Sequence, residues 1–79
     1  MTPKVRRDFS VLEFTVEFRG RNIEACITHQ ALQDHFGADE DPITWVRAYE
    51  NHQVRIHRAV QQLVLDGVQE PVTVWSSRF

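Results

Sequence analysis

The stretch Val11-Leu12-Glu13-Phe14-Thr15-Val16-Glu17-Phe18 decides the fold, because apolar and polar side chains alternate along it. A period of two is typical of a β-strand that buries one face. A second alternation over Ile23–Ile27 follows the turn residues Arg19–Asn22, in which Gly20 can adopt the positive φ of a tight turn. The two runs predict an antiparallel hairpin with one apolar face and one face rich in glutamate.

Two helical segments are predicted after this hairpin. Thr28 is suited to cap a short helix over His29–Phe36, which Gly37 is suited to end. Asp41-Pro42 then places a capping carboxylate before a proline. From there apolar side chains recur at spacings of three and four residues, and the pattern predicts one long amphipathic helix over Pro42–Asp66.

A third strand is predicted near the end of the chain. After Gly67, which is suited to end the long helix, Pro71 opens a segment in which Val72 and Val74 alternate with Thr73 and Trp75. The expected order β-β-α-α-β is that of a small α+β, two-layer domain. We expect a mostly antiparallel three-stranded sheet with the long helix packed on one face. The last strand is expected beside the first, with its direction left open.

Length and composition are those of one small globular domain. The chain has 79 residues, of which 42% are hydrophobic and 25% are charged. Residues 1–8 are basic and nearly without apolar side chains, so we expect a flexible N-terminal leader or loosely docked arm there, followed by a single domain over residues 9–79. A domain of this size buries only about 60% of the surface of its unfolded chain, which favours self-association.

Cysteine content and hydropathy indicate the compartment. Cys26 is the only cysteine, so no intrachain disulfide can form, and a lone thiol fits a reducing environment. No apolar run approaches the roughly 20 residues that a membrane span needs. We therefore expect a soluble cytoplasmic protein with no membrane partner.

Dispersed motifs along the chain resemble a known family. Phe14-Thr15-Val16, Ile27-Thr28-x-x-Ala31-Leu32 and Ala48-Tyr49-x-x-His52-x-x-x-Ile56-x-x-x-Val60 look like the small proteobacterial proteins grouped as domain of unknown function 1488. The resemblance covers most of residues 9–79. It implies an α+β fold of the kind described above, and it implies no catalytic or cofactor-binding residues, because the function of the family is not characterised.

Histidine and cysteine positions favour neither a metal site nor a catalytic site. His52 and His57 are five residues apart, whereas two imidazoles on a helix meet one ion at i, i+4. His52 is expected to hydrogen-bond to a sheet residue instead. Cys26 lacks the positive surroundings that activate a thiol, and the chain has no Gly-rich phosphate loop or catalytic triad. We expect no metal, no cofactor and no catalytic residue, and therefore a protein that is not an enzyme.

Apolar side chains at surface positions predict a protein interface. Trp75 is expected to point to the outer face of the sheet beside Phe79, on a strand at the sheet edge. Val54 falls on the polar side of the long helix. We take Trp75, Phe79 and Val54 as candidate contacts in a homodimer or with a larger protein partner. The alternative for Trp75 is partial cover by its cross-strand neighbours.

A basic stripe on the long helix predicts the alternative function. Arg47, Asn51, Arg55 and Arg58 fall within about 80° of one another at helical spacing, and they could contact a phosphate backbone or base edges. The net charge of −2 argues against nucleic acid, and the polar outer face of any amphipathic helix explains the same residues. Nucleic-acid binding is therefore the second hypothesis, behind a non-enzymatic interaction domain.

Overall fold

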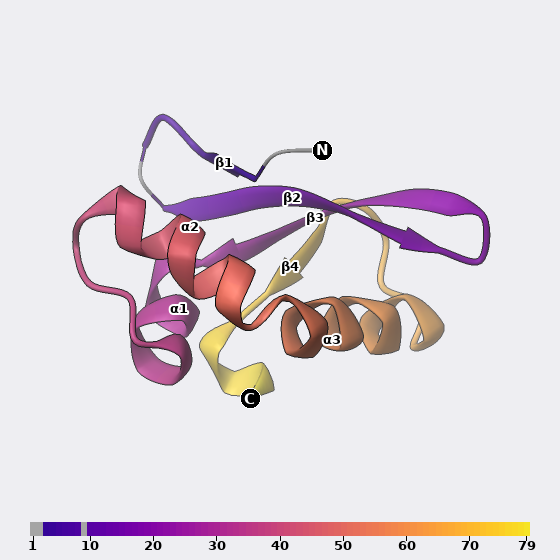
Figure 1. Ribbon diagram of the computed structural model, residues 1–79. Helices are drawn as coiled ribbons and strands as arrows, with labels where there is room; N and C mark the ends of the chain where they lie inside the picture. The colour runs from indigo at the N-terminus through magenta and orange to yellow at the C-terminus, as the bar shows by residue number, and fades with distance from the viewer. Residues whose placement is uncertain (1–2, 9) are drawn as a thin grey trace.

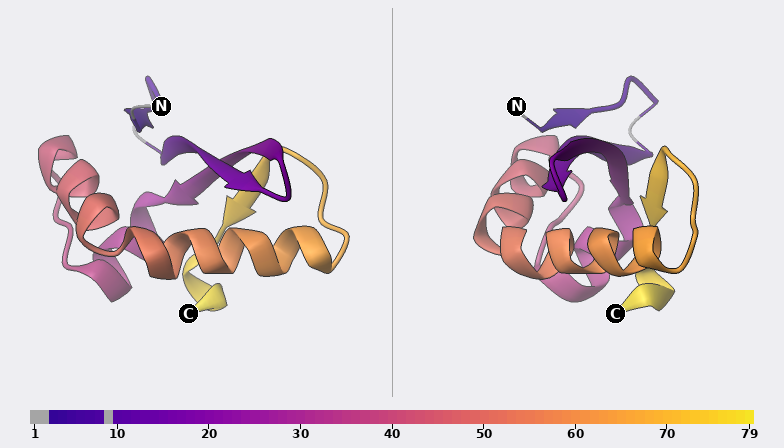
Figure 2. Two further views of the ribbon diagram at one scale, coloured as in Figure 1. Left: turned by 45° about the vertical axis from the view of Figure 1, so that its right-hand side comes forward. Right: turned by 90° about the vertical axis from the view of Figure 1, so that its right-hand side faces the viewer.

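A four-stranded sheet and three α-helices make up the part of the chain that the structure describes, residues 3–8 and 10–79. In this computed structural model the strands are β1 (Lys4–Val5), β2 (Val11–Phe18), β3 (Arg21–Thr28) and β4 (Val72–Val74). The helices are α1 (His29–Phe36), α2 (Pro42–Asn51) and α3 (Gln53–Leu65), and a 3-10 turn, η1 (Ser76–Arg78), follows β4. The helices gather on one side of the sheet (Figures 1 and 2). The predicted α+β class is confirmed.

The β2–β3 hairpin forms as the alternation predicts. The two strands pair antiparallel from Val11↔Thr28 to Phe18↔Arg21. Arg19 and Gly20 connect them with positive φ angles of 54° and 77°. Two central residues with positive φ make the turn whose twist matches that of the flanking strands, so the hairpin closes without splaying.

The sheet has one more strand than the sequence predicts. Lys4 pairs with Glu13 and Val5 pairs with Leu12, so β1 adds antiparallel to the outer edge of β2. Of the two expected alternatives, Lys4–Val5 therefore follows the docked arm rather than the flexible leader, because the open edge of β2 offers backbone groups that this segment satisfies. Residues 1, 2 and 9, the last of which is the expected first residue of the domain, lie outside the described residues.

The last strand lies beside β3 rather than beside β2. The sheet order is β1-β2-β3-β4, and β4 runs parallel to β3 with Ala25 opposite Val72 and Ile27 opposite Val74. The expected three-stranded, mostly antiparallel sheet is thus corrected to a mixed four-stranded one. The chain leaves β3 through three helices on one face, and a long crossover of this kind can join two parallel strands. Part of the outer edge of β2 is already taken by β1.

The predicted long helix is two helices that bend at His52. The backbone of His52 leaves the helical region, with φ −123° and ψ 24°. A straight helix over residues 42–65 would be about 36 Å long, whereas the longest dimension of the molecule is 33 Å. The bend lets α2 pack on α1 and β1 while α3 packs on β2 and β4. Each half thereby follows its own part of a twisted sheet, and the two helix axes diverge in Figure 2.

The helix ends coincide with the predicted capping residues. Thr28 Oγ1 accepts a 3.1 Å hydrogen bond from the amide of Ala31 at the start of α1, and Gly37 ends that helix with φ 78°. Asp41 caps α2 through its side chain. After α3 the amide of Gly67 donates to the carbonyl of Val64. These local signals are confirmed because each satisfies backbone groups that a helix end leaves free.

The hydrophobic core lies between the sheet and the helices. Its most deeply buried side chains come from three strands and all three α-helices: Leu12, Val16, Ile23, Ile27, Leu32, Trp45, Ile56, Val60, Val72 and Val74. Trp45 Nε1 donates a 2.7 Å hydrogen bond to the carbonyl oxygen of Asp39, so its polar atom is satisfied. Among the described residues no helix is both long and apolar enough to cross a lipid bilayer.

Candidate functional site

Trp75 lies exposed at the open edge of the sheet. Its side chain is 63% exposed, whereas Val72 and Val74 of the preceding strand are fully buried. Because β4 is the last strand in the sheet order, it has no neighbouring strand beyond it among the described residues. We call β4 together with Trp75 the edge surface. The exposure of Trp75 agrees with a direction opposite to Val72 and Val74, and its role as a contact stays a prediction.

Phe79 packs against α1. Its ring meets the ring of Phe36 edge-on, with centroids 4.9 Å apart. The turn η1 directs it there, and the carbonyl oxygen of Ser76 is bound to His35 Nε2 at 2.9 Å. Phe79 is thus partly buried against the core, and its role as a contact beside Trp75 stays a prediction.

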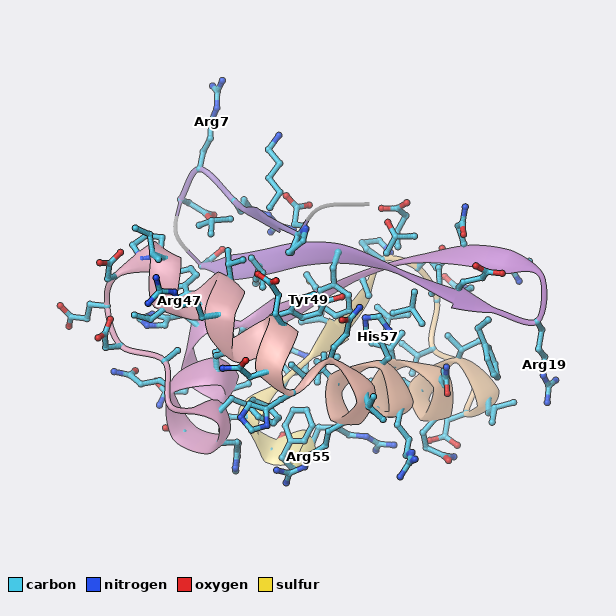
Figure 3. All side chains as sticks on the ribbon, in the orientation of Figure 1. Arg7, Arg19, Arg47, Tyr49, Arg55 and His57 are labelled. Atoms are coloured by element: carbon cyan, nitrogen blue, oxygen red, sulfur yellow. The ribbon has the colours of Figure 1, made fainter. Side chains whose placement is uncertain are left out.

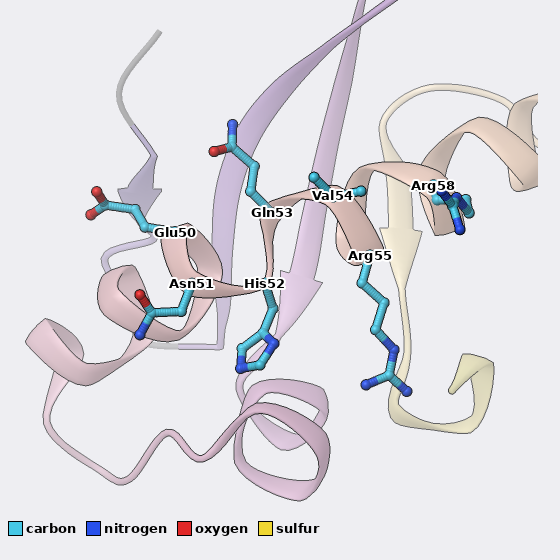
Figure 4. Close-up of a pocket in the computed structure, with 7 residues that line it drawn as sticks. All are labelled: Glu50, Asn51, His52, Gln53, Val54, Arg55 and Arg58. Atoms are coloured by element: carbon cyan, nitrogen blue, oxygen red, sulfur yellow. The ribbon is translucent and has the colours of Figure 1, made fainter.

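The predicted arginine stripe is divided by the bend at His52. Asn51, Arg55 and Arg58 line one open depression of about 490 Å³ between the end of α2 and the start of α3, and Arg47 does not line it. Figure 3 shows Arg47 on α2, well apart from Arg55 on α3. The full lining is Glu50, Asn51, His52, Gln53, Val54, Arg55 and Arg58 (Figure 4). We call this place the arginine depression.

Val54, the third candidate protein contact, also lines the arginine depression. Its side chain is 73% exposed beside Arg55. The structure therefore assigns the three candidate contacts to three settings: Trp75 to the edge surface, Phe79 to the packing of η1 on α1, and Val54 to the arginine depression. A single patch of all three does not follow from this arrangement.

Aromatic rings rather than carboxylates hold Arg55 in place. Its guanidinium carbon lies 5.3 Å from the ring centroid of Phe36 and 5.6 Å from that of Phe79. The ion pairs of the described residues join Arg6 to Glu13, Arg21 to Glu70 and Arg78 to Asp66, so they include neither Arg55 nor Arg58. Both cations in the arginine depression are therefore available to a ligand.

His52 also contacts one of the two aromatic rings that hold Arg55, Phe36 and Phe79, which we call the aromatic platform. Its imidazole lies against the ring of Phe36 with centroids 5.0 Å apart. Among the described residues, His52 makes no hydrogen bond to a residue of the sheet. The expected bond to the sheet is thus wrong, because the bend turns His52 toward α1. Nothing in the sequence pattern indicated the platform, since Phe36, Phe79 and Arg55 come from three separate elements.

A side-chain hydrogen bond that the sequence pattern does not indicate joins α2 to α3. The hydroxyl of Tyr49 pairs with Nε2 of His57, and the imidazole of His57 stacks on Phe14 with centroids 5.7 Å apart. Burial raises the pKa of Tyr49 to about 12 and lowers the pKa of His57. A depression of about 340 Å³ lined by Thr15, Glu17, Asn22 and His57 lies beside the pair.

Cys26 and His29 are held by packing and hydrogen bonds within the fold. Cys26 is 4% exposed, and its Sγ lies 3.4 Å from Thr73 Oγ1 across the β3–β4 pair. His29 stacks on Trp45 and bonds through Nε2 to the carbonyl oxygen of Asp39 at 2.9 Å. Across residues 3–8 and 10–79, no three side chains of His, Cys, Asp or Glu lie together as a metal site would require.

Comparison with known proteins relates the chain to a family. The model of the family described as "Protein of unknown function (DUF1488)" matches residues 3–75, nearly the whole chain. No curated protein and no solved structure gives a significant match. The motifs that carry the resemblance lie at structural positions, with Thr28 capping α1 and with Ile56 and Val60 in the core. The chain belongs to the family of proteins of unknown function called DUF1488.

Proposed function

We propose that this chain is a non-enzymatic interaction domain that forms a homodimer through the edge surface. The observation that carries the proposal is the 63% exposure of Trp75 directly after an edge strand. An open edge presents unpaired backbone groups, and a large exposed aromatic side chain beside it adds apolar area to bury. A two-fold axis would pair β4 antiparallel with β4 of a second copy and extend the sheet across both chains.

The free energy of dimerisation requires both burial of Trp75 and backbone pairing of β4. The exposed part of Trp75 amounts to roughly 150 Å², whose burial contributes about 4 kcal/mol per copy. Association costs about 4–15 kcal/mol in lost rotational and translational freedom. Two buried tryptophans offset the middle of that range, so the backbone pairing of β4 has to supply the surplus. A variant that removes only the indole should therefore dissociate the dimer.

Three aspartates have pKa values that do not suit a general acid. Hydrogen bonds from Ser10, Ser76 and the Asp41 amide hold the pKa values of Asp8, Asp34 and Asp39, respectively, below their usual value. A general acid needs a carboxyl pKa raised toward neutrality, which is the opposite direction. The buried, unbridged Cys26 supports a reducing compartment, so a cytoplasmic location belongs to this proposal.

The test is the solution mass of Trp75→Ala beside the wild type, measured by light scattering with a thermal melt of each. We expect a dimeric wild type and a monomeric Trp75→Ala that keeps the same fold. Leu65→Ala is the matched control, because Leu65 is 53% exposed at the end of α3 and does not belong to the edge surface. A Trp75→Ala chain with unchanged mass and unchanged stability would contradict the proposal. A monomer that still captures a larger chain through Trp75 would move the proposal to a heterologous partner.

Nucleic-acid binding remains a second candidate, favoured by the gathering of Asn51, Arg55 and Arg58 in one depression without a carboxylate partner. It predicts association that weakens as salt rises and that Arg55→Glu combined with Arg58→Glu abolishes. Association that is insensitive to both substitutions would remove this candidate.

A further inference from the structure

We infer that the arginine depression is a binding site for a single compact oxyanion, of the phosphate-monoester class, held by Arg55 and Arg58 with His52 beside them. This inference is independent of the proposed homodimer, because the residues of the edge surface and of the arginine depression are different.

Arg55 is positioned for recognition before any ligand arrives. A guanidinium group carries five N–H donors in its plane and none on its faces. Phe36 and Phe79 take up a face of Arg55, at 5.3 and 5.6 Å from the guanidinium carbon to the ring centroids, so its in-plane donors stay free. An arginine whose plane is fixed in this way loses less side-chain freedom when it binds a bidentate oxyanion.

Arg58 and His52 line the same depression as Arg55. Arg58 lies three residues further along α3, a spacing that places two side chains on one helix face. His52 contacts the same Phe36 ring as Arg55 does, with centroids 5.0 Å apart. Figure 4 shows His52 and Arg55 pointing to one side of the bend. The lining carboxylate, Glu50, and the amide of Gln53 point to the other side.

The bend favours one anion over a row of phosphates. On a straight helix Arg47 would extend the basic stripe by two turns beyond Arg55, but the break at His52 leaves it outside the depression. Arg7 and Arg19 lie at distant ends of the molecule (Figure 3). A net charge of −2 gives no long-range attraction for a polyanion. The two unpaired arginines therefore form a local site rather than a track.

Tetrahedral oxyanions suit this donor set better than carboxylates do. A phosphate monoester presents three acceptor oxygens, enough to engage one guanidinium fork at two of them and a second cation at the third. A carboxylate has two oxygens, which one arginine fork already occupies. The depression of about 490 Å³ also has room for the group to which the phosphate is attached.

The probe is inorganic phosphate, followed by thymidine 5′-monophosphate and thymidine, titrated into the intact chain at constant ionic strength in chloride. The readout is the NMR shift of the arginine Nε–H and His52 ring signals. We expect saturable shifts at Arg55, Arg58 and His52 with phosphate and the monophosphate, and none with thymidine. Arg58→Gln should weaken binding about tenfold, the effect of one lost charge-assisted hydrogen bond.

Two further variants keep the test decisive. Arg47→Gln is the matched control: it removes an exposed arginine outside the depression and should leave the affinity unchanged. Arg55→Lys keeps the charge but loses the fork and should weaken binding about as much as Arg58→Gln. Shifts that do not saturate, or that Arg47→Gln reduces equally, would overturn the inference. Oligothymidines without a terminal phosphate would also overturn it if they bound more tightly than the monophosphate and if their affinity rose with length. That result would favour the nucleic-acid candidate.

Discussion

Removing the Tyr49 hydroxyl should destabilise the domain by breaking its hydrogen bond to His57. Tyr49 is 4% exposed, and its ring packs on Phe14 with centroids 4.7 Å apart. Tyr49→Phe keeps this ring packing and deletes only the donor that pairs with His57 Nε2. A half-buried acceptor left without a partner costs about 1–3 kcal/mol. We expect the low end of this range, because water can reach part of the His57 ring.

The corresponding measurement is a thermal melt at pH 7. For a domain of this length 1 kcal/mol lowers Tm by about 4–8 °C. Urea unfolding should give the same loss in free energy with an unchanged slope, since the surface exposed on unfolding hardly changes. The near-identical volumes of tyrosine and phenylalanine exclude a cavity as the cause.

A double-mutant cycle isolates the hydrogen bond. In a His57→Phe background the acceptor is already absent, and the new ring can still stack on Phe14. Tyr49→Phe should then cost much less than it does in the wild type. An equal cost in both backgrounds would refute the reasoning, because it would place the effect in solvation of the hydroxyl rather than in its contact with His57.

Three further predictions concern pH and the helix ends. Because burial lowers the pKa of His57, the unfolded chain takes up a proton near its ordinary value of about 6.5 before the folded chain does, so stability should fall from pH 7 to pH 5. His57→Gln, which can still bond to Tyr49, should flatten this slope in urea unfolding; an unchanged slope would assign it to other groups. Thr28→Ala removes the cap on the Ala31 amide and should cost about 1 kcal/mol, with Thr28→Ser close to wild type as the control. Gly37→Ala should cost about 1–2 kcal/mol in a thermal melt because its φ is 78°; no loss would mean that the turn rearranges.

Signals read over a few neighbouring residues predicted the fold most accurately. The Arg19-Gly20 turn, the Thr28 cap and the Gly67 stop each satisfy or position backbone groups within five residues of themselves. Such features depend on the local chain alone, so the pattern of side chains is sufficient to find them.

Features that depend on the rest of the molecule were not predictable in the same way. The strand β1 is Lys4–Val5, too short to show an alternation, and it forms only because an edge of β2 is open. No proline or glycine near His52 indicates a bend in the helix. It follows from the size and twist of the sheet on which the two helices pack. The parallel direction of β4 likewise depends on which sheet edge remains free.

The candidate sites show the same division. The exposure of Trp75 follows from strand alternation and was predictable. The position of Phe79 was not, because it depends on the reversal of the chain in η1 and on the packing partner Phe36. The predicted stripe required a straight helix through Arg47, Asn51, Arg55 and Arg58. The bend at His52, which the sequence did not indicate, separates Arg47 from the other three residues.

The solution mass across protein concentration tests the central claim most directly. Light scattering on the wild type should give twice the 9.3 kDa mass of the chain at high concentration, falling toward a single chain on dilution. Trp75→Ala should remain a single chain over the whole range, with the melting temperature that the wild type shows when diluted to the monomer. A wild type that stays at 9.3 kDa into the millimolar range would contradict self-association through the edge surface.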